Sequence, residues 1–158
     1  MTIDPTATLS TLQIGACGVL LLQYRLLKMG IDSSPMTTDS GIDLVAYSPG
    51  AKRAVTIQVK TNLRPKQSGG KGKKTLDWWL KKSSPAELVA LVDLESEGIW
   101  IFKHLELDKL AQQQPDERFH FYFYLKDQGE VRIKKGNLSR EEDFVTFRLE
   151  QRQREIFG

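Results

Sequence analysis

Residues Gly41 to Thr61 read GIDLVAYSPGAKRAVTIQVKT. Apolar and polar residues alternate on both sides of Pro49-Gly50, a dipeptide typical of a tight turn. The stretch therefore predicts a β-hairpin with strands at Gly41–Tyr47 and Arg53–Thr61. Its polar residues need an explanation, because aspartate is uncommon in strands and Asp43 lies between two apolar residues without a role in the turn.

The alternation predicts which side chains share a face of this hairpin. In the second strand, Gln58 and Lys60 point to the same face. If the turn centres on Gly50-Ala51, Asp43 lies opposite Gln58 on that face, and Gly41 lies opposite Lys60. This register brings a carboxylate, an amide and an ammonium group together. The alternative is an edge hairpin whose polar face is solvated, and a slip of one residue would also separate the groups.

A helix is predicted before the hairpin. The run Leu12–Leu27 is almost continuously apolar and is followed by Gly30, which is typical of a helix end. We expect this helix to be buried on more than one side. Gly15 and Gly18 lie on nearly the same face, and they indicate a close approach of a sheet or another backbone.

A basic segment follows the hairpin. Residues Arg64–Lys74, RPKQSGGKGKK, contain five cations and no acid, and they are predicted to form a loop. The next residues, Thr75–Lys82, are predicted to form a short helix. Cations that contact phosphates and an aromatic ring that stacks on bases are typical of nucleic-acid binding. The candidate contacts are Arg64, Lys66, Lys71, Lys73, Lys74 and Trp78. The alternative is a solubilising loop before a helix whose tryptophans anchor the core, with Trp79 the stronger candidate for burial.

The remaining pattern predicts strands at Leu88–Leu94, Ile99–Phe102 and Phe119–Leu125, and helices at Leu105–Gln114 and Glu141–Phe157. This order of elements favours an α/β or α+β chain with a mixed sheet flanked by helices. The chain has 158 residues, no internal repeat and no long linker, so we expect one domain that spans residues 1–158.

The composition indicates the cellular compartment of the protein and limits its possible partners. The single Cys17 cannot form an intramolecular disulfide and fits a reducing compartment, and the longest apolar run is too short to cross a bilayer. We therefore expect a cytoplasmic protein without a membrane partner. The net charge of +3 is compatible with nucleic acid but does not require it. His104 and His120 have no partner at metal-ligand spacing and are expected to be structural.

The helix, hairpin and basic segment together resemble the PD-(D/E)XK nuclease superfamily, which has the fold of type II restriction enzymes and archaeal Holliday junction resolvases. The resemblance rests on Asp43 and the Gln58-Val59-Lys60 triplet, a Q-x-K variant of the family motif, and it covers about the first half of the chain. The motif is short, and the order of the three segments supports it. The resemblance implies a restriction endonuclease-like fold with a central mixed sheet flanked by helices, an αβββαβ core.

In that family, the aspartate, the first residue of the triplet and the backbone carbonyl of the middle residue bind Mg²⁺. Carried over, the metal ligands would be Asp43, Gln58 and the Val59 carbonyl, which are oxygen donors suited to Mg²⁺ or Mn²⁺. Lys60 would stabilise the attacking water and the charge that develops on phosphate. The implied activity is metal-dependent hydrolysis of DNA phosphodiester bonds by Asp43, Gln58 and Lys60. Double-strand cutters of this fold commonly dimerise, so a homodimer is a further expectation.

Two features depart from the family pattern. Gln58 stands where most members have glutamate or aspartate, and the first helix contains no acid, so that Gln13 is the nearest substitute and Asp39 a further candidate. These departures support an alternative, in which the protein is a catalytically weak or inactive member of the same fold that acts as a nucleic-acid-binding module. A third reading is a protein-interaction domain whose hairpin cluster is solvated surface.

Overall fold

The computed structural model describes residues 3–4, 6–126, 128–131 and 136–158. In chain order the elements are α1 (Thr11–Lys28), β1 (Ser33–Pro35), β2 (Leu44–Ser48), β3 (Arg53–Asn62), β4 (Lys66–Gln67), η1 (Ser68–Gly70), β5 (Lys74–Lys81), β6 (Leu88–Asp93), β7 (Gly98–Lys103), η2 (His104–Glu106), α2 (Leu107–Leu110), β8 (Arg118–Tyr124), η3 (Glu141–Phe147) and α3 (Leu149–Phe157). No helix in these ranges is long and apolar enough to cross a membrane.

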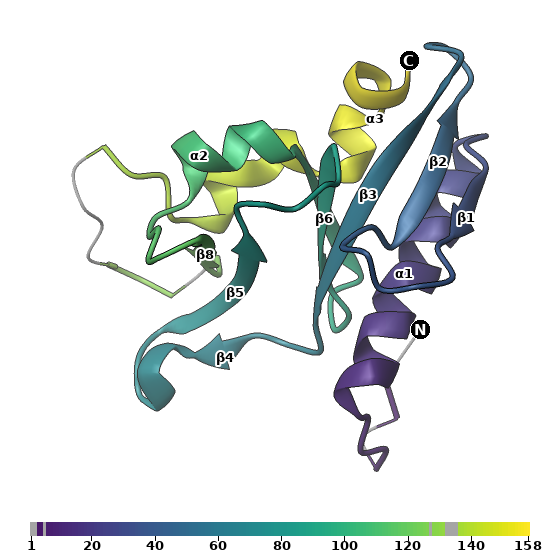
Figure 1. The fold of residues 1–158 in the computed structure, drawn as a ribbon. Helices are drawn as coiled ribbons and strands as arrows, with labels where there is room; N and C mark the ends of the chain where they lie inside the picture. The colour runs from purple at the N-terminus through teal and green to yellow at the C-terminus, as the bar shows by residue number, and fades with distance from the viewer. Residues whose placement is uncertain (1–2, 5, 127, 132–135) are drawn as a thin grey trace.

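The central sheet has five strands in the order β1-β2-β3-β6-β7. Strands β3 and β6 are parallel, and the other neighbouring pairs are antiparallel. The sheet is therefore mixed, and β3 lies inside it, between β2 and β6. This arrangement confirms the predicted fold class, a central mixed sheet flanked by helices (Figure 1).

Helices α1 and α3 pack on one face of the central sheet (Figure 1). Helix α1 begins at a capping box, in which Ser10 Oγ accepts from the Gln13 amide and Gln13 Oε1 accepts from the Ser10 amide. Gly18 is buried against Thr61 of β3, where an added Cβ would lie 2.9 Å from Thr61 Cβ. The predicted close approach therefore occurs at Gly18, whereas among the described residues nothing lies within 4 Å of a Cβ placed on Gly15.

The opposite side of α1 faces outward. Its apolar residues there are strongly exposed: Leu12, Leu20, Tyr24 and Leu27. The expectation that this helix is buried on more than one side is wrong. The sheet covers the side that carries Gly18 and Leu22, and no described element covers the other.

A second sheet, in the order β4-β5-β8, packs on the other face of the central sheet. Residues Thr75–Lys82, predicted to be helical, lie instead mainly in strand β5, which pairs with β8 from Thr75 to Lys81. The physical reason is burial at a period of two, because Leu76, Trp78 and Leu80 enter an aromatic core that β8 and β6 complete. The connection between the parallel strands β3 and β6 thus contains a β-hairpin.

Two predicted helices are shorter than expected. The segment expected at Leu105–Gln114 forms η2 and then α2, which ends at Leu110. The segment expected at Glu141–Phe157 is divided at Arg148, whose extended ψ of 139° separates η3 from α3. The division lets η3 place Phe144 in the aromatic core while α3 places Leu149 and Phe157 in the core on the opposite face of the central sheet.

A buried guanidinium joins α3 to the central sheet. Arg152, which is 6% exposed, donates to Glu106, to Glu155 and to the carbonyl of Ile101 in β7. Burial alone would raise the pKa of Glu106, but the hydrogen bonds from Arg152 and from the Lys103 amide hold it below its ordinary value. The hydrogen bond from Arg152 lowers the pKa of Glu155 to about 2. Both carboxylates therefore contribute stability in their charged form.

The two glycines of α1 form a matched pair for a stability test. Gly15→Ala should raise the free energy of unfolding by up to about 1 kcal/mol, because alanine has the higher helix propensity and its methyl group meets nothing. Gly18→Ala should lower it by about 1–3 kcal/mol, because the new methyl group overlaps Thr61. Urea unfolding followed by circular dichroism measures both changes. Equal effects would contradict the close contact between Gly18 and β3.

Removal of the Arg152 side chain should destabilise the protein in a pH-dependent way. Arg152→Ala should cost about 3 kcal/mol at pH 7, because it leaves the partly buried carboxylate of Glu106 without its partner. The lowered pKa values of Glu106 and Glu155 give stability that is present above about pH 4.5 and is lost as the pH falls toward 2. The difference between wild type and variant should therefore shrink in acid. Arg154→Ala, an exposed change in the same helix, is the control, and a pH-independent difference would contradict the assignment.

Candidate functional site

The hairpin has the register that the sequence predicts. Leu44 pairs with Ile57 and Ser48 with Arg53, so the next residues beyond the paired strands are Asp43 and Gln58. Regular pairing starts at Leu44 and not at Gly41, because the Asp43 side chain replaces the backbone there. Asp43 Oδ2 accepts a hydrogen bond of 2.6 Å from the Val59 amide, while the Asp43 amide donates to the Ile57 carbonyl at 2.9 Å.

Gln58 is buried, with 8% of its surface exposed. It faces the same side of the central sheet as Val89, its neighbour in β6, whose side chain belongs to the aromatic core. Gln58 Oε1 is buried and has no hydrogen-bond partner among the described residues. A buried amide oxygen without a partner costs about 1–3 kcal/mol, so this atom can accept a hydrogen bond or a cation at no cost to the contacts present. The alternative of a solvated polar face does not apply to Gln58.

Lys60 lies on the same face, beside Leu91 of β6, and is partly exposed. Among the described residues it forms no ion pair within 4 Å. Val59, the middle residue of the triplet, lies between Asp43 on one side and Ala90 of β6 on the other. The carboxylate of Asp43, just before β2, thus lies beside the part of β3 that carries the Gln58 amide and the Lys60 ammonium group, with apolar residues of β6 along the other edge of β3.

The donors at this place are oxygen atoms. Within the described ranges no group of three or more His, Cys, Asp or Glu residues could hold a metal. A cation here would therefore have Asp43 as its charged ligand and the Gln58 oxygen as a neutral one, a donor type suited to Mg²⁺. Gln13 is not a free ligand, because it is exposed and its side-chain oxygen caps α1. Asp39 lies on an exposed loop.

The basic segment forms a hairpin instead of an open loop. Lys66 and Gln67 of β4 pair with β5, and the tip turns at Gly69 and Gly70, which have positive φ angles of 60° and 79°. All five predicted cations are exposed, and none is in an ion pair with a described residue: Arg64, Lys66, Lys71, Lys73 and Lys74. The positive charge of this hairpin is therefore available to a partner.

The two tryptophans have the reverse of their predicted positions. Trp78 is 3% exposed and packs against Trp100 and Phe123, so its predicted contact with bases is wrong. Trp79 is 42% exposed, on the outer face of the second sheet. The physical reason is that strand β5 alternates its side chains between core and solvent, which the helical interpretation missed.

A hydrogen bond between Asp77 and His120, beside Trp79, was not predicted from the sequence. His120 Nε2 lies 3.0 Å from Asp77 Oδ2, and Trp79 stacks on the His120 ring with a centroid distance of 4.1 Å. The hydrogen bond with His120 lowers the pKa of Asp77 below its ordinary value, against the opposing effect of partial burial. The period-two pattern of both strands was the signal that could have located this group.

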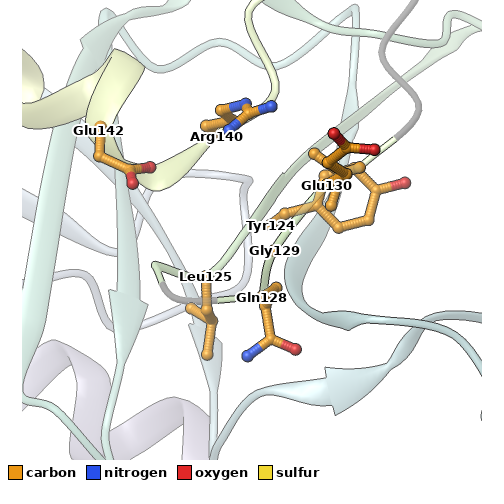
Figure 2. Close-up of a pocket in the computed structure, with 8 residues that line it drawn as sticks. Tyr124, Leu125, Gln128, Gly129, Glu130, Arg140 and Glu142 are labelled. Carbon is orange, nitrogen blue, oxygen red and sulfur yellow. The ribbon is translucent and has the colours of Figure 1, made fainter.

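A separate pocket lies at the end of β8. It has a volume of about 360 Å³ and is lined by Tyr124, Arg140, Glu130 and Glu142, among others (Figure 2). None of the predicted site residues lines it. The carboxylates of Glu130 and Glu142 accompany Arg140 there, so the lining carries no excess of positive charge for a phosphate.

Comparison with solved structures identifies the architecture. The structure is similar to that of a bacterial homing endonuclease, I-Ssp6803I, with a TM-score of 0.58, over 95% of this chain and 93% of the other. The chain has a nuclease-like fold. The sequences are 18% identical, so the likeness concerns the fold. The structure of MepB covers 82% of this chain and 93% of the other at 14% identity, but its TM-score of 0.35 is too low to support an argument. No protein-family model and no curated protein sequence matches the chain.

Two substitutions at Asp43 separate its structural from its chemical role. Asp43→Ala should lower the free energy of unfolding by about 1–3 kcal/mol, because the Val59 amide loses its acceptor. Asp43→Asn keeps an acceptor oxygen and should cost less than half as much. Thermal and urea unfolding of both variants measure the difference. Equal losses would show that the hydrogen bond to Val59 does not hold the hairpin.

Proposed function

We propose that the protein is a metal-dependent DNA endonuclease that hydrolyses phosphodiester bonds with Asp43, Gln58 and Lys60. The observation that carries the proposal is the buried, unpartnered oxygen of Gln58, which lies one residue from the amide that Asp43 binds. The likeness in fold to a homing endonuclease supports the same class of activity. The finer assignment to the PD-(D/E)XK superfamily follows from the Asp43 and Q-x-K motif.

The residues at the end of β3 fit a Mg²⁺ or Mn²⁺ ion. Asp43 uses Oδ2 for the Val59 amide, so Oδ1 is its oxygen for a cation, and Gln58 Oε1 is the second. The Val59 carbonyl is the third proposed ligand. A bound ion would polarise the scissile phosphate and lower the pKa of a water molecule beside it.

The chain's own residues supply the rest of the chemistry. Lys60 carries a positive charge beside an apolar border, where an ammonium group stabilises negative charge more strongly than it does in bulk water. We assign it two tasks: to hold the attacking water by a hydrogen bond and to stabilise the charge that develops on the phosphate oxygens. The exposed cations of the basic segment bind the DNA phosphates that flank the scissile one. These cations are Arg64, Lys66, Lys71, Lys73 and Lys74.

The activity test is the relaxation of supercoiled plasmid DNA with Mg²⁺ or Mn²⁺. Wild type should nick or linearise the plasmid, and Lys60→Ala should lower the rate by about 100-fold or more, because it removes a charged group that acts in the transition state. Lys109→Ala, an exposed change in α2, is the matched control for loss of one positive charge. Equal cleavage by Lys60→Ala and wild type would exclude this site as the catalytic one.

The single carboxylate of the site favours one alternative function, a nucleic-acid-binding module without catalysis. A site with one negative charge holds a divalent cation weakly. Calorimetric titration with Mg²⁺ or Mn²⁺ distinguishes the two functions. Binding that Asp43→Asn abolishes supports the enzyme, and salt-dependent DNA binding without Asp43-dependent metal binding supports the module. Asp43→Asn is preferred over alanine because it keeps the acceptor for the Val59 amide.

A further inference from the structure

The outer face of the second sheet carries a row of rings. Strand alternation directs Trp79 of β5 and His120, Tyr122 and Tyr124 of β8 to this face, opposite the phenylalanines that enter the core. We call these four residues, with Lys81 and Arg118, the aromatic face. Trp79 pairs with His120 and Lys81 with Arg118 across the two strands.

The rings form one continuous ladder. Trp79 and His120 are parallel, with an interplanar angle of 4° and centroids 4.1 Å apart. His120 and Tyr122 follow at 5.2 Å, and Tyr122 and Tyr124 at 6.1 Å. The spacing is that of rings in contact, with an interplanar angle of 45° between His120 and Tyr122 and of 85° between Tyr122 and Tyr124, so the ladder offers both ring faces and ring edges along β8.

The core does not require these rings. The aromatic core lies on the opposite face of the sheet and is filled by Trp78, Phe119, Phe121 and Phe123. Trp79 is 42% exposed, and the other three rings are partly exposed. A large indole left in solvent on a sheet face, beside further rings, is typical of a binding surface.

The charge of the aromatic face is complementary to an anionic polymer. Lys81 and Arg118 are exposed at one end, and Lys66 of β4 is exposed at the other. Asp77, the carboxylate that β5 directs to this face, is hydrogen-bonded to His120, and Glu130 and Glu142 lie beside Tyr124 together with Arg140. The Arg118 guanidinium lies over the indole of Trp79 at 4.8 Å, and a base that takes this position would release the guanidinium to a phosphate.

We propose that the aromatic face binds an unpaired strand of DNA, with bases stacked on Trp79 and the tyrosines and phosphates held by Arg118, Lys81 and Lys66. The face is joined to the candidate catalytic strand, because Asn62 Nδ2 donates to the Asp77 carbonyl at 2.7 Å, and Asn62 lies two residues beyond Lys60 on β3. The assignment rests on the proposed function only in taking DNA as the polymer. It predicts that the substrate contains an unpaired or locally opened segment.

The test is fluorescence anisotropy of a labelled 12-nucleotide oligothymidylate at low salt without divalent metal. Trp79→Ala should weaken binding by about 5- to 100-fold, because one base loses its stacking partner. Trp79→Phe should restore part of the affinity, since it keeps a ring. Tyr47→Ala, an exposed aromatic change on β2, is the matched control and should leave the affinity unchanged.

Two further variants change exposed residues only, so they test the proposal even if Trp79→Ala does not fold. Arg118→Ala and Lys81→Ala should each reduce the salt dependence of binding without changing the aromatic core. Unchanged binding by Trp79→Ala and both cation variants would overturn the proposal, as would equal competition by a duplex of the same length. Lys109→Ala, an exposed change in α2, is the charge-matched control and should bind oligothymidylate at wild-type affinity. If the wild-type protein binds oligothymidylate through Trp79 but does not cleave plasmid DNA, the catalytic proposal is refuted and the binding proposal stands.

Discussion

The hydrogen bond between the Asp43 carboxylate and the Val59 amide determines the geometry of the candidate site. At Asp43 the backbone pairing between β2 and β3 ends, and a side-chain oxygen takes the place of the next backbone carbonyl. An amide in the middle of a sheet must have an acceptor, so the carboxylate stabilises the hairpin while the chain before it turns away. One aspartate thereby fixes the strand that carries Gln58 and Lys60 and contributes the charged oxygen of the site.

The polar groups of β3 differ in exposure. Gln58 and Lys60 both pair with β6, but Gln58 is buried, whereas Lys60, which lies closer to the end of the strand, is partly exposed. The two faces of the central sheet pack against different elements. One holds α1 and α3 on an aliphatic core, and the other holds the second sheet on an aromatic core. The polar groups lie on the aromatic side, near the strands that carry the exposed cations.

The hairpin and its register could be predicted because a turn dipeptide and period-two alternation lie within one short stretch. The identity of β5 could not, because the eight residues TLDWWLKK fit a helix equally well without their partner. That partner, β8, lies about 40 residues further along the chain, and only its pairing shows which tryptophan enters the core. Burial of Gln58 also depends on a distant element, the parallel strand β6. The division of the C-terminal segment at Arg148 left no signal, since neither glycine nor proline lies at the break.

The contact between Gly18 and Thr61 lets α1 fix the position of the candidate site residues on β3. Thr61 directly follows Lys60 in the sequence. The backbone of α1 contacts the Thr61 side chain directly, because Gly18 has no side chain to separate them. A displacement of α1 along or across the sheet would therefore move Thr61, and with it Lys60, because one rigid peptide unit joins the two residues. The position of Lys60 therefore depends on how α1 packs against β3. Many nucleases of the resembled family carry a glutamate on this helix, whereas in this chain the helix contains no acid and packs against the strand that carries Lys60.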